Sequence, residues 1–321
     1  MGVTRFGLQI PSFTYPSVSD EKLFERVAEI AVTAERSGFD SVWVMDHFYQ
    51  IPMVGRPDEP MLESYSLLCA LAARTQRARL GTMVTGVTYR NPAHLATIVT
   101  TLDVVSSGRA ILGIGAAWNQ QEHEGYGWEY APVRERMDRL EEAIQICRAM
   151  FTEERPSFEG TYYRIHEAIN SPRPITPGGP PILIGGSGEK RTLKLVAKYA
   201  DACNLFGDLP TIKHKLDVLR QHCDDAGRDP AEITKTRLGG LFVAEDESEL
   251  QRGLERYAQS RGIPPDQVRG YVLAGTPDQL VEQAGEYFEA GLDGLVFNMI
   301  QAHQIEPVAL AGTALSSAFG P

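Results

Sequence analysis

The sequence predicts a (β/α)8 barrel, a closed ring of eight parallel strands in which a helix follows each strand. Short apolar segments that suit buried strands alternate with segments of helical periodicity along the whole chain. Eight strand segments can be recognised, and eight strands close into a ring that side chains can fill. The 321 residues leave room for such a barrel, which takes roughly 250 residues, and for additional segments.

Four strands are predicted in the first half of the chain, at residues 5–10, 41–45, 78–84 and 109–114. The helix after the first strand begins beside Ser19, a favourable N-cap residue, and ends at Gly38, which suits a left-handed C-cap. The next two helices are predicted at residues 64–75 and from Asn91-Pro92 to residue 107.

The alternation is interrupted after the fourth strand. A long helix is predicted at residues 133–151, a β-hairpin around Glu159-Gly160, and a proline-rich tract at residues 171–181. We interpret residues 155–180 as an insertion that lies over the barrel mouth as a lid, not as a second domain. Residues 1–321 are therefore expected to form a single domain.

Four further strands are predicted at residues 181–185, 201–205, 234–243 and 294–299. Helices are predicted between them at residues 189–199, 211–227, 247–260 and 277–290. A doubly wound open sheet is the competing fold for such an alternation. The first strand is not followed by Gly-x-Gly-x-x-Gly, which argues against that competitor.

The composition is that of a globular protein with an acidic surface, since the formal net charge is −11. Such a surface repels phosphates, so neither nucleic acid nor an anionic membrane is expected as the main partner. The chain has no run of 18 apolar residues, no basic region of a signal peptide and no Cys-x-x-Cys pair among its four cysteines. We therefore expect a reduced, cytoplasmic protein.

The loops after the strands build the active site of such a barrel. Asp46-His47 follows the second strand, and a histidine can donate or accept a proton near neutral pH. Adjacent side chains on a strand point to opposite faces, so both enter the site only where the strand has ended. A capping aspartate beside a packed histidine is the alternative, but the end of a barrel strand favours a functional pair.

Glycine-containing segments follow two other strands. Residues 185–188 (Gly-Gly-Ser-Gly) precede a predicted helix, so their backbone amides suit an anion such as phosphate. A plain turn that needs positive φ angles is the alternative. Gly113 and Gly115 permit a close backbone approach, which either a flat ring or tight barrel packing requires. His47, His94, His123 and Asp208 are the candidate metal ligands, but the first strand has no His-x-His, the fourth strand has no lysine, and His94 is predicted on a helix, so no catalytic metal is expected.

Five segments in sequence order carry a family resemblance. They are residues 43–48 (Trp-Val-Met-Asp-His-Phe), 80–85 (Leu-Gly-Thr-Met-Val-Thr), 108–118 (Gly-Arg-Ala-Ile-Leu-Gly-Ile-Gly-Ala-Ala-Trp), 157–163 (Ser-Phe-Glu-Gly-Thr-Tyr-Tyr) and 184–190 (Ile-Gly-Gly-Ser-Gly-Glu-Lys). The chain resembles the luciferase-like monooxygenase superfamily, and within it the branch that uses the deazaflavin coenzyme F420. The resemblance extends from Phe6 to Phe297.

The resemblance implies a TIM barrel with a cofactor ring across its mouth. Asp46 matches a position that hydrogen-bonds the cofactor, and Met83-Val84 matches a non-proline cis peptide that supports the ring. The backbone of residues 185–188 matches the cradle for the cofactor phosphate. The positions assigned to cofactor binding are Asp46, Met83, Val84, Thr85, Gly115, Gln121, Gly185, Gly186, Ser187 and Gly188.

The same resemblance assigns catalysis. His47 matches an acid/base position of sugar-phosphate dehydrogenases, and Glu122 is the second predicted catalytic residue. A tryptophan that follows the Asp-His pair in those enzymes is Ile51 here, and their phosphate-holding basic cluster has only Lys213 and Arg237 as distant counterparts. A sugar-phosphate substrate is therefore not favoured.

These observations predict an F420-dependent oxidoreductase that transfers a hydride between the deazaflavin and a small organic substrate. An FMN-dependent monooxygenase that uses molecular oxygen is the alternative, because both rings use the same cradle. A barrel that only binds or stores a chromophore is a third hypothesis, and the Asp46-His47 pair argues against it. The resemblance also implies a homodimer.

Overall fold

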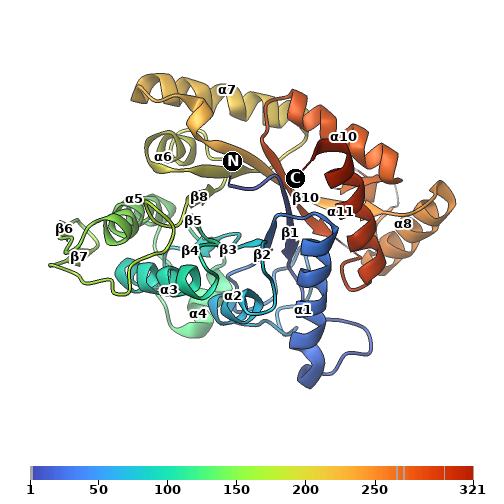
Figure 1. Cartoon of the computed structure of the whole chain (residues 1–321), viewed down its shortest axis with the longest axis horizontal. Helices are drawn as coiled ribbons and strands as arrows, with labels where there is room; N and C mark the ends of the chain where they lie inside the picture. Colours follow the sequence, from blue (N-terminus) through green and yellow to red (C-terminus); the bar gives the residue numbers. More distant parts are fainter. Residues whose placement is uncertain (1–2, 265–266, 270–271, 300, 321) are drawn as a thin grey trace.

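The computed structural model describes residues 3–264, 267–269, 272–299 and 301–320, and at its centre these residues form a closed ring of eight parallel strands (Figure 1). Around the ring the strands are β1 (Phe6–Ile10), β2 (Ser41–Val44), β3 (Arg79–Thr82) with its continuation β4 (Thr85–Gly86), β5 (Ala110–Gly115), β8 (Ile182–Gly185), β9 (Ala202–Leu205), β10 (Thr234–Val243) and β12 (Gly294–Met299). The ring closes because β12 pairs with both β1 and β10. The predicted (β/α)8 fold is confirmed.

Helices surround the ring. They are α1 (Asp20–Ser37), α2 (Ser64–Ala72), α3 (Pro92–Val105), α4 (Gln120–Tyr126), α5 (Val133–Thr152), α6 (Thr192–Tyr199), α7 (Leu209–Ala226), α8 (Glu247–Arg261), α10 (Pro277–Glu289) and α11 (Ile305–Phe319), with a short 3-10 helix at Pro230–Glu232. α1 shows why they form: Val27, Ile30 and Ala34 recur at helical spacing and are fully buried. Gly38 ends the helix with a φ of 111° and donates its N–H to the Ala34 carbonyl.

The apolar side chains form separate layers inside and outside the ring. The interior cluster contains Val3, Trp43, Met83, Ile111, Leu183, Ala202 and Val296. A larger cluster fills the space between the strands and the helices. Because successive side chains of a strand alternate between these layers, a polar residue on an inward position faces the barrel interior.

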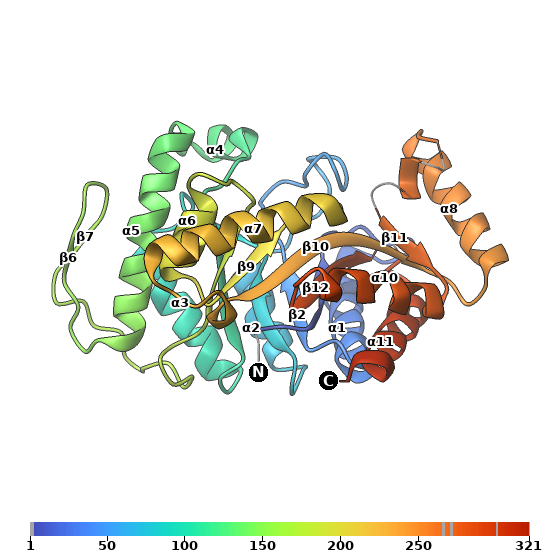
Figure 2. The same cartoon turned by 90° about the horizontal axis from the view of Figure 1, so that it is seen from above.

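Two strands differ from the sequence prediction. The third predicted strand is interrupted at Met83-Val84, where a cis peptide separates β3 from β4. A short strand that was not predicted, β11 (Val272–Gly275), pairs in parallel with the last four residues of β10. β10 is therefore longer than the ring requires, and Figure 2 shows it extending toward β11 and α8 beside the barrel.

Residues 155–180 lie beside the barrel and not over its mouth, in contrast to the expected lid. They contain the predicted hairpin, formed by β6 (Phe158–Glu159) and β7 (Arg164–Ile165), which Figure 1 shows at the outer side of α5. The carboxylate of Glu142 on α5 accepts hydrogen bonds from three backbone N–H groups of the hairpin turn. Farther along, Asp103 on α3 accepts from the N–H groups of Ile175 and Thr176.

None of the helices in the described part of the chain is both long and apolar enough to cross a lipid bilayer. The four cysteines carry free thiols.

Candidate active site

A cavity of about 520 Å³ lies at the carboxyl ends of the strands. Its walls come from the ends of β1, β3, β10 and β12, from the loops after β1, β2, β5, β9 and β12, and from α8 and β11. The lining residues are Gln9, Ile10, Pro11, Ser12, Thr14, Tyr15, Met45, His47, Ile51, Met53, Val54, Met83, Trp118, Phe206, Leu238, Gly240, Tyr257, Arg261, Val272, Asn298, Met299, Ala302 and His303. Most of these side chains are apolar, as is usual for a small-molecule site.

His47 lies in the wall of this cavity, three residues after the end of β2. Its Nδ1 is 2.9 Å from Oε2 of Glu122, and 13% of its side chain is exposed. An ionised carboxylate only accepts hydrogen bonds, so Nδ1 carries the hydrogen in this pair. Nε2 makes no described protein contact and is the nitrogen available to a ligand.

Glu122 is fully buried in the first turn of α4. Besides His47, it accepts hydrogen bonds from the N–H groups of Phe48 and Tyr49 and from the Tyr89 hydroxyl, at 2.5, 3.0 and 2.9 Å. Burial acts to raise the pKa of Glu122, but the bonds to His47 and to these backbone groups hold it below its usual value. Glu122 does not line the cavity. Its geometry is that of a positioning residue for His47, whereas the sequence assigned it a direct catalytic role.

Trp118 covers His47 from the loop after β5. The two ring centroids are 5.4 Å apart with an interplanar angle of 68°, and 47% of the tryptophan is exposed. The preceding residue, Ala117, has a φ of 59°, a left-handed conformation that is unfavourable for alanine. Backbone strain of this kind persists where the surroundings enforce it, and here it sets the direction of the chain into Trp118.

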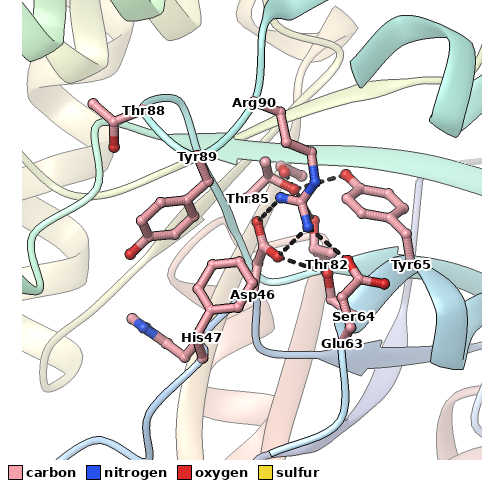
Figure 3. A network of polar contacts seen from close by, with 12 residues as sticks. Asp46, His47, Glu63, Ser64, Tyr65, Thr82, Thr85, Thr88, Tyr89 and Arg90 are labelled. Atoms are coloured by element: carbon pink, nitrogen blue, oxygen red, sulfur yellow. Dashed lines mark hydrogen bonds and ion pairs between the residues drawn. The ribbon is translucent and has the colours of Figure 1, made fainter. Parts of the chain in front are cut away.

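Asp46 faces away from the cavity, in contrast to its predicted contact with a cofactor. Its oxygen atoms accept hydrogen bonds from the Arg90 guanidinium at 2.7 and 3.0 Å and from the Ser64 hydroxyl at 2.6 Å. Arg90 also binds Glu63. Figure 3 shows this ion pair between Asp46 and Arg90, with the His47 side chain directed away from it. Asp46 therefore holds the end of β2 against the loop after β4.

Arg90 stays charged in this buried network. Burial acts to lower the pKa of Arg90, but the neighbouring Asp46 charge raises it above its usual value. The hydroxyl of Tyr65 lies in the same network and is 2.7 Å from that of Thr85. Burial and the Asp46 charge raise the pKa of Tyr65, so its hydroxyl remains protonated.

The predicted cis peptide at Met83-Val84 is present. Nε2 of Gln9 donates to the Met83 carbonyl at 3.0 Å. A Cβ atom at Gly115 would lie 2.9 Å from Cγ2 of Val84, and one at Gly185 would lie 2.8 Å from its Cγ1. The glycines at these two strand ends therefore make room for Val84, which is tight barrel packing. Of these four predicted cofactor positions, Met83 lines the cavity, and Val84, Gly115 and Gly185 pack against one another.

The loop after β8 has the properties of an anion cradle. Gly186 has a φ of 120°, and the Ser187 hydroxyl accepts the N–H of Phe206 at 3.0 Å. Among the described residues, the N–H groups of Ser187 and Gly188 donate to no acceptor. α6 begins only at Thr192, three residues later than predicted, so the loop is longer and its amides are more accessible.

Of the ten predicted cofactor positions, only Met83 is among the described residues that line the cavity. The Thr85 hydroxyl is fully buried between those of Tyr65 and Thr82. Gln121 is exposed on α4 and does not line the cavity. In the described part of the chain no group of three or more His, Cys, Asp or Glu side chains could hold a metal ion.

Sequence reasoning missed several cavity residues. Gln9 and Asn298 interrupt apolar strands, and a polar residue on an inward strand position is a signal that could have identified them. Tyr257 and Arg261 reach the cavity from α8, more than 200 residues after His47 in the chain. Their presence depends on the pairing of the end of β10 with β11, which no local pattern shows.

Comparison with known proteins identifies a matching family model and relatives that cover most of the chain. A family model described as luciferase-like monooxygenase matches residues 4–262. The F420-dependent glucose-6-phosphate dehydrogenase of Amycolatopsis mediterranei is 31% identical over 301 residues, which cover 85% of this chain and 87% of that protein. The protein of the same name from Nocardia farcinica is 32% identical over 302 residues, with the same coverage of both chains.

Solved structures share the fold over nearly the whole length. An F420-dependent secondary alcohol dehydrogenase in complex with an F420-acetone adduct superposes with a TM-score of 0.80 at 21% identity, covering 99% of both chains. The oxygenating constituent of 3,6-diketocamphane monooxygenase from Pseudomonas putida, in complex with FMN, gives a TM-score of 0.78 at 22% identity and covers 99% of this chain and 98% of that one.

Proposed function

Because the chain belongs to the luciferase-like monooxygenase family, we propose that it is an oxidoreductase that exchanges a hydride between coenzyme F420 and a small organic substrate. The observation that carries the proposal is the His47–Glu122 pair in the wall of the cavity. Relatives at 31 and 32% identity are named as F420-dependent dehydrogenases, which favours F420 over FMN.

The residues present fit a deazaflavin cofactor. Met83 lines the cavity, and behind it Gly115 and Gly185 add no side chain where Val84 packs, so no polar side chain projects from this part of the barrel. The free N–H groups of Ser187 and Gly188 suit a phosphate. When bound, F420 supplies the carbon that gives or accepts the hydride.

His47 handles the proton that accompanies the hydride. With Nδ1 held by Glu122, its Nε2 takes a proton from a substrate hydroxyl in the oxidative direction and returns one in the reductive direction. The buried carboxylate of Glu122 stabilises the imidazolium that forms. Trp118 covers His47 and limits its contact with water.

Replacement of His47 tests this assignment. We expect His47→Ala to lower kcat by on the order of 10²-fold or more while the dissociation constant of F420, measured by fluorescence titration, changes little. His94→Ala is the matched control, since His94 is exposed on α3. Unchanged turnover of His47→Ala with bound F420 would show that another group moves the proton.

The second candidate function is an FMN-dependent monooxygenase, which the name of the matching family and the FMN complex of one structural neighbour favour. Titration of the purified protein with F420 and with FMN separates the two. Tight F420 binding without measurable FMN affinity supports the deazaflavin enzyme. Flavin retained through purification, with substrate-dependent oxygen consumption, supports the monooxygenase. The homodimer stays a prediction, which sedimentation velocity tests.

A further inference from the structure

We propose that the cavity takes an uncharged substrate with a largely apolar body, and that Gln9 and Asn298 receive a hydroxyl or N–H group at its inner end. The inference rests on the proposed function for the identity of the cofactor. The inference that Gln9 and Asn298 bind a donor group follows from the residues of the cavity and does not depend on the proposed function.

Gln9 and Asn298 form an unsatisfied polar pair in the barrel interior. They are register partners on the adjacent strands β1 and β12, and both line the cavity. Oε1 of Gln9 and Oδ1 of Asn298 are buried and have no hydrogen-bond partner in the described protein. Buried carbonyl oxygens are normally paired, so two unpaired acceptors on one cavity wall indicate a ligand that supplies donors.

The orientation of Gln9 is determined by its neighbour. Its Nε2 donates to the Met83 carbonyl, which can only accept, so the amide cannot be reversed and Oε1 must face elsewhere. Only 1% of Gln9 is exposed. An acceptor fixed in this way discriminates strongly between ligands with and without a hydrogen-bond donor. A ligand without a donor leaves the acceptor desolvated and unpaired.

The pair lies deeper in the barrel than His47. Gln9 is level with Trp43 in the register of β1 and β2, and His47 follows four residues later, beyond the end of β2. A substrate whose reacting carbon lies near His47 therefore reaches Gln9 and Asn298 with its opposite end. The cavity side chains between these two levels include Met45 and Met299, which suit an apolar body.

The charged groups of the cavity do not suit an anionic substrate. Its described lining contains no lysine and a single arginine, Arg261. The guanidinium of Arg261 donates to the carbonyls of Met53 and Val54 at 2.9 and 3.0 Å. His47 is bound to Glu122. A phosphate would lose its hydration without gaining a dedicated counter-charge, so a substrate like the glucose 6-phosphate in the names of the relatives is disfavoured.

The test uses full-length protein and three probes. They are a decalin diol with one hydroxyl on each ring, the decalin alcohol with a single hydroxyl, and glucose 6-phosphate. F420 affinity is measured first by fluorescence. Probe binding is then measured by saturation-transfer NMR, both with and without F420, and F420 reduction is followed where the cofactor binds.

We expect the diol to bind at least about tenfold more tightly than the single alcohol, and glucose 6-phosphate to bind more weakly than either. Asn298→Leu should remove this preference for the diol and leave F420 affinity unchanged. Asn298→Ser, which places its oxygen farther from the cavity, should reduce the preference. Asn204→Leu is the matched control, because Asn204 is a buried inward-facing amide that does not line the cavity.

Three outcomes overturn the inference. Preferred binding of glucose 6-phosphate rejects the uncharged substrate. Equal binding of both alcohols by the wild type, or a diol preference retained in Asn298→Leu, means that Gln9 and Asn298 bind only water. A loss of F420 affinity in both Asn298 variants but not in Asn204→Leu assigns the acceptors to the cofactor. If F420 does not bind at all, the proposed function fails, and the binding data without cofactor still test the donor site.

Discussion

Glu122 occupies a site in which nearly every hydrogen-bonding position of its carboxylate is used. Two backbone N–H groups, the Tyr89 hydroxyl and His47 all donate to it, and water does not reach it. Its negative charge therefore acts on His47 through a fixed geometry. A carboxylate placed in this way selects the histidine tautomer and stabilises the protonated ring, as in the triads of hydrolases.

Replacement of Glu122 by glutamine tests whether Glu122 acts on His47 without contributing to the binding of substrate or F420. We expect Glu122→Gln to lower kcat by on the order of 10²-fold, because the neutral amide cannot stabilise the imidazolium. KM and the F420 dissociation constant should change by no more than about threefold. Steady-state kinetics and fluorescence titration measure these quantities. A large change in F420 affinity with normal kcat would contradict the positioning role.

Ala117 is the residue at which backbone strain can be measured. Ala117→Gly should stabilise the protein by about 1 kcal/mol, since glycine adopts a φ of 59° without the clash of a Cβ atom. Urea denaturation measures the change. The neighbouring Ala116 has no positive φ, so Ala116→Gly should have the opposite effect, a loss of about 0.5–1 kcal/mol. A destabilised Ala117→Gly would show that the conformation is not strained.

At this scale the sequence identified the segment of Asp46 and His47 but not the partners of the two side chains. Their adjacency at a strand end predicted a functional pair, and His47 does line the cavity. Asp46 turns outward because Arg90, which lies 44 residues later, provides its partner. A pairing between distant residues depends on the folded arrangement of β2 and β4, and local spacing carries no information about it.

Individual elements are joined by buried charges at their ends. Glu35 in the last turn of α1 accepts hydrogen bonds from the consecutive N–H groups of Gln76, Arg77 and Ala78, at 2.9, 2.6 and 2.7 Å. Burial acts to raise the pKa of Glu35, but these three groups hold it below its usual value. The carboxylate thus attaches α1 to the chain that enters β3.

Glu35→Gln should destabilise the protein by about 2 kcal/mol at neutral pH, because the amide is a weaker acceptor and cannot receive three N–H groups. The folded pKa is depressed, so the stabilisation by Glu35 is complete above the ordinary value of 4.5 and is lost as the pH falls through the lower folded value. Urea denaturation from pH 7 to pH 3 should show the difference from wild type shrinking below about pH 4.5. The exposed Glu29→Gln is the control and should cost less than about 0.5 kcal/mol.

The elements of the ring could be predicted because buried parallel strands are short apolar runs. β10 and β12 were predicted with the bounds that the structure has. β11 was not predicted, since its four residues alternate between buried and half-buried positions and its partner is the end of β10. The hairpin of residues 155–180 was recognised, but its position depends on Glu142, which lies in the preceding helix.

On the scale of the whole molecule, one arginine connects the extension beside the barrel to the barrel mouth. Arg261, at the end of α8, donates to the carbonyls of Met53 and Val54 in the loop after β2. Both segments line the cavity, so this contact joins two parts of its wall.

Arg261→Ala should increase amide hydrogen exchange about tenfold in residues 51–55 and 247–261, because loss of these bonds lowers the free energy of local opening. The KM for the organic substrate should rise, while the affinity for F420 stays constant. Arg252→Ala is the control, since Arg252 lies on the same helix and its described hydrogen bond is to Ser248 in the preceding turn. Exchange that remains at the wild-type rate in Arg261→Ala would indicate that apolar packing alone holds α8.

The length of β10 has a consequence for how this barrel could change its substrate. Its first four residues, Thr234–Arg237, pair with β9 inside the ring, whereas Gly240–Val243 pair with β11 outside it. Leu241 is the last residue of β10 that pairs with β12, so the segment beyond it can be lengthened, shortened or exchanged without altering the register that closes the ring. Exchange of this segment would change the cavity wall that α8 and β11 provide, while the ring of strands and His47 stay the same.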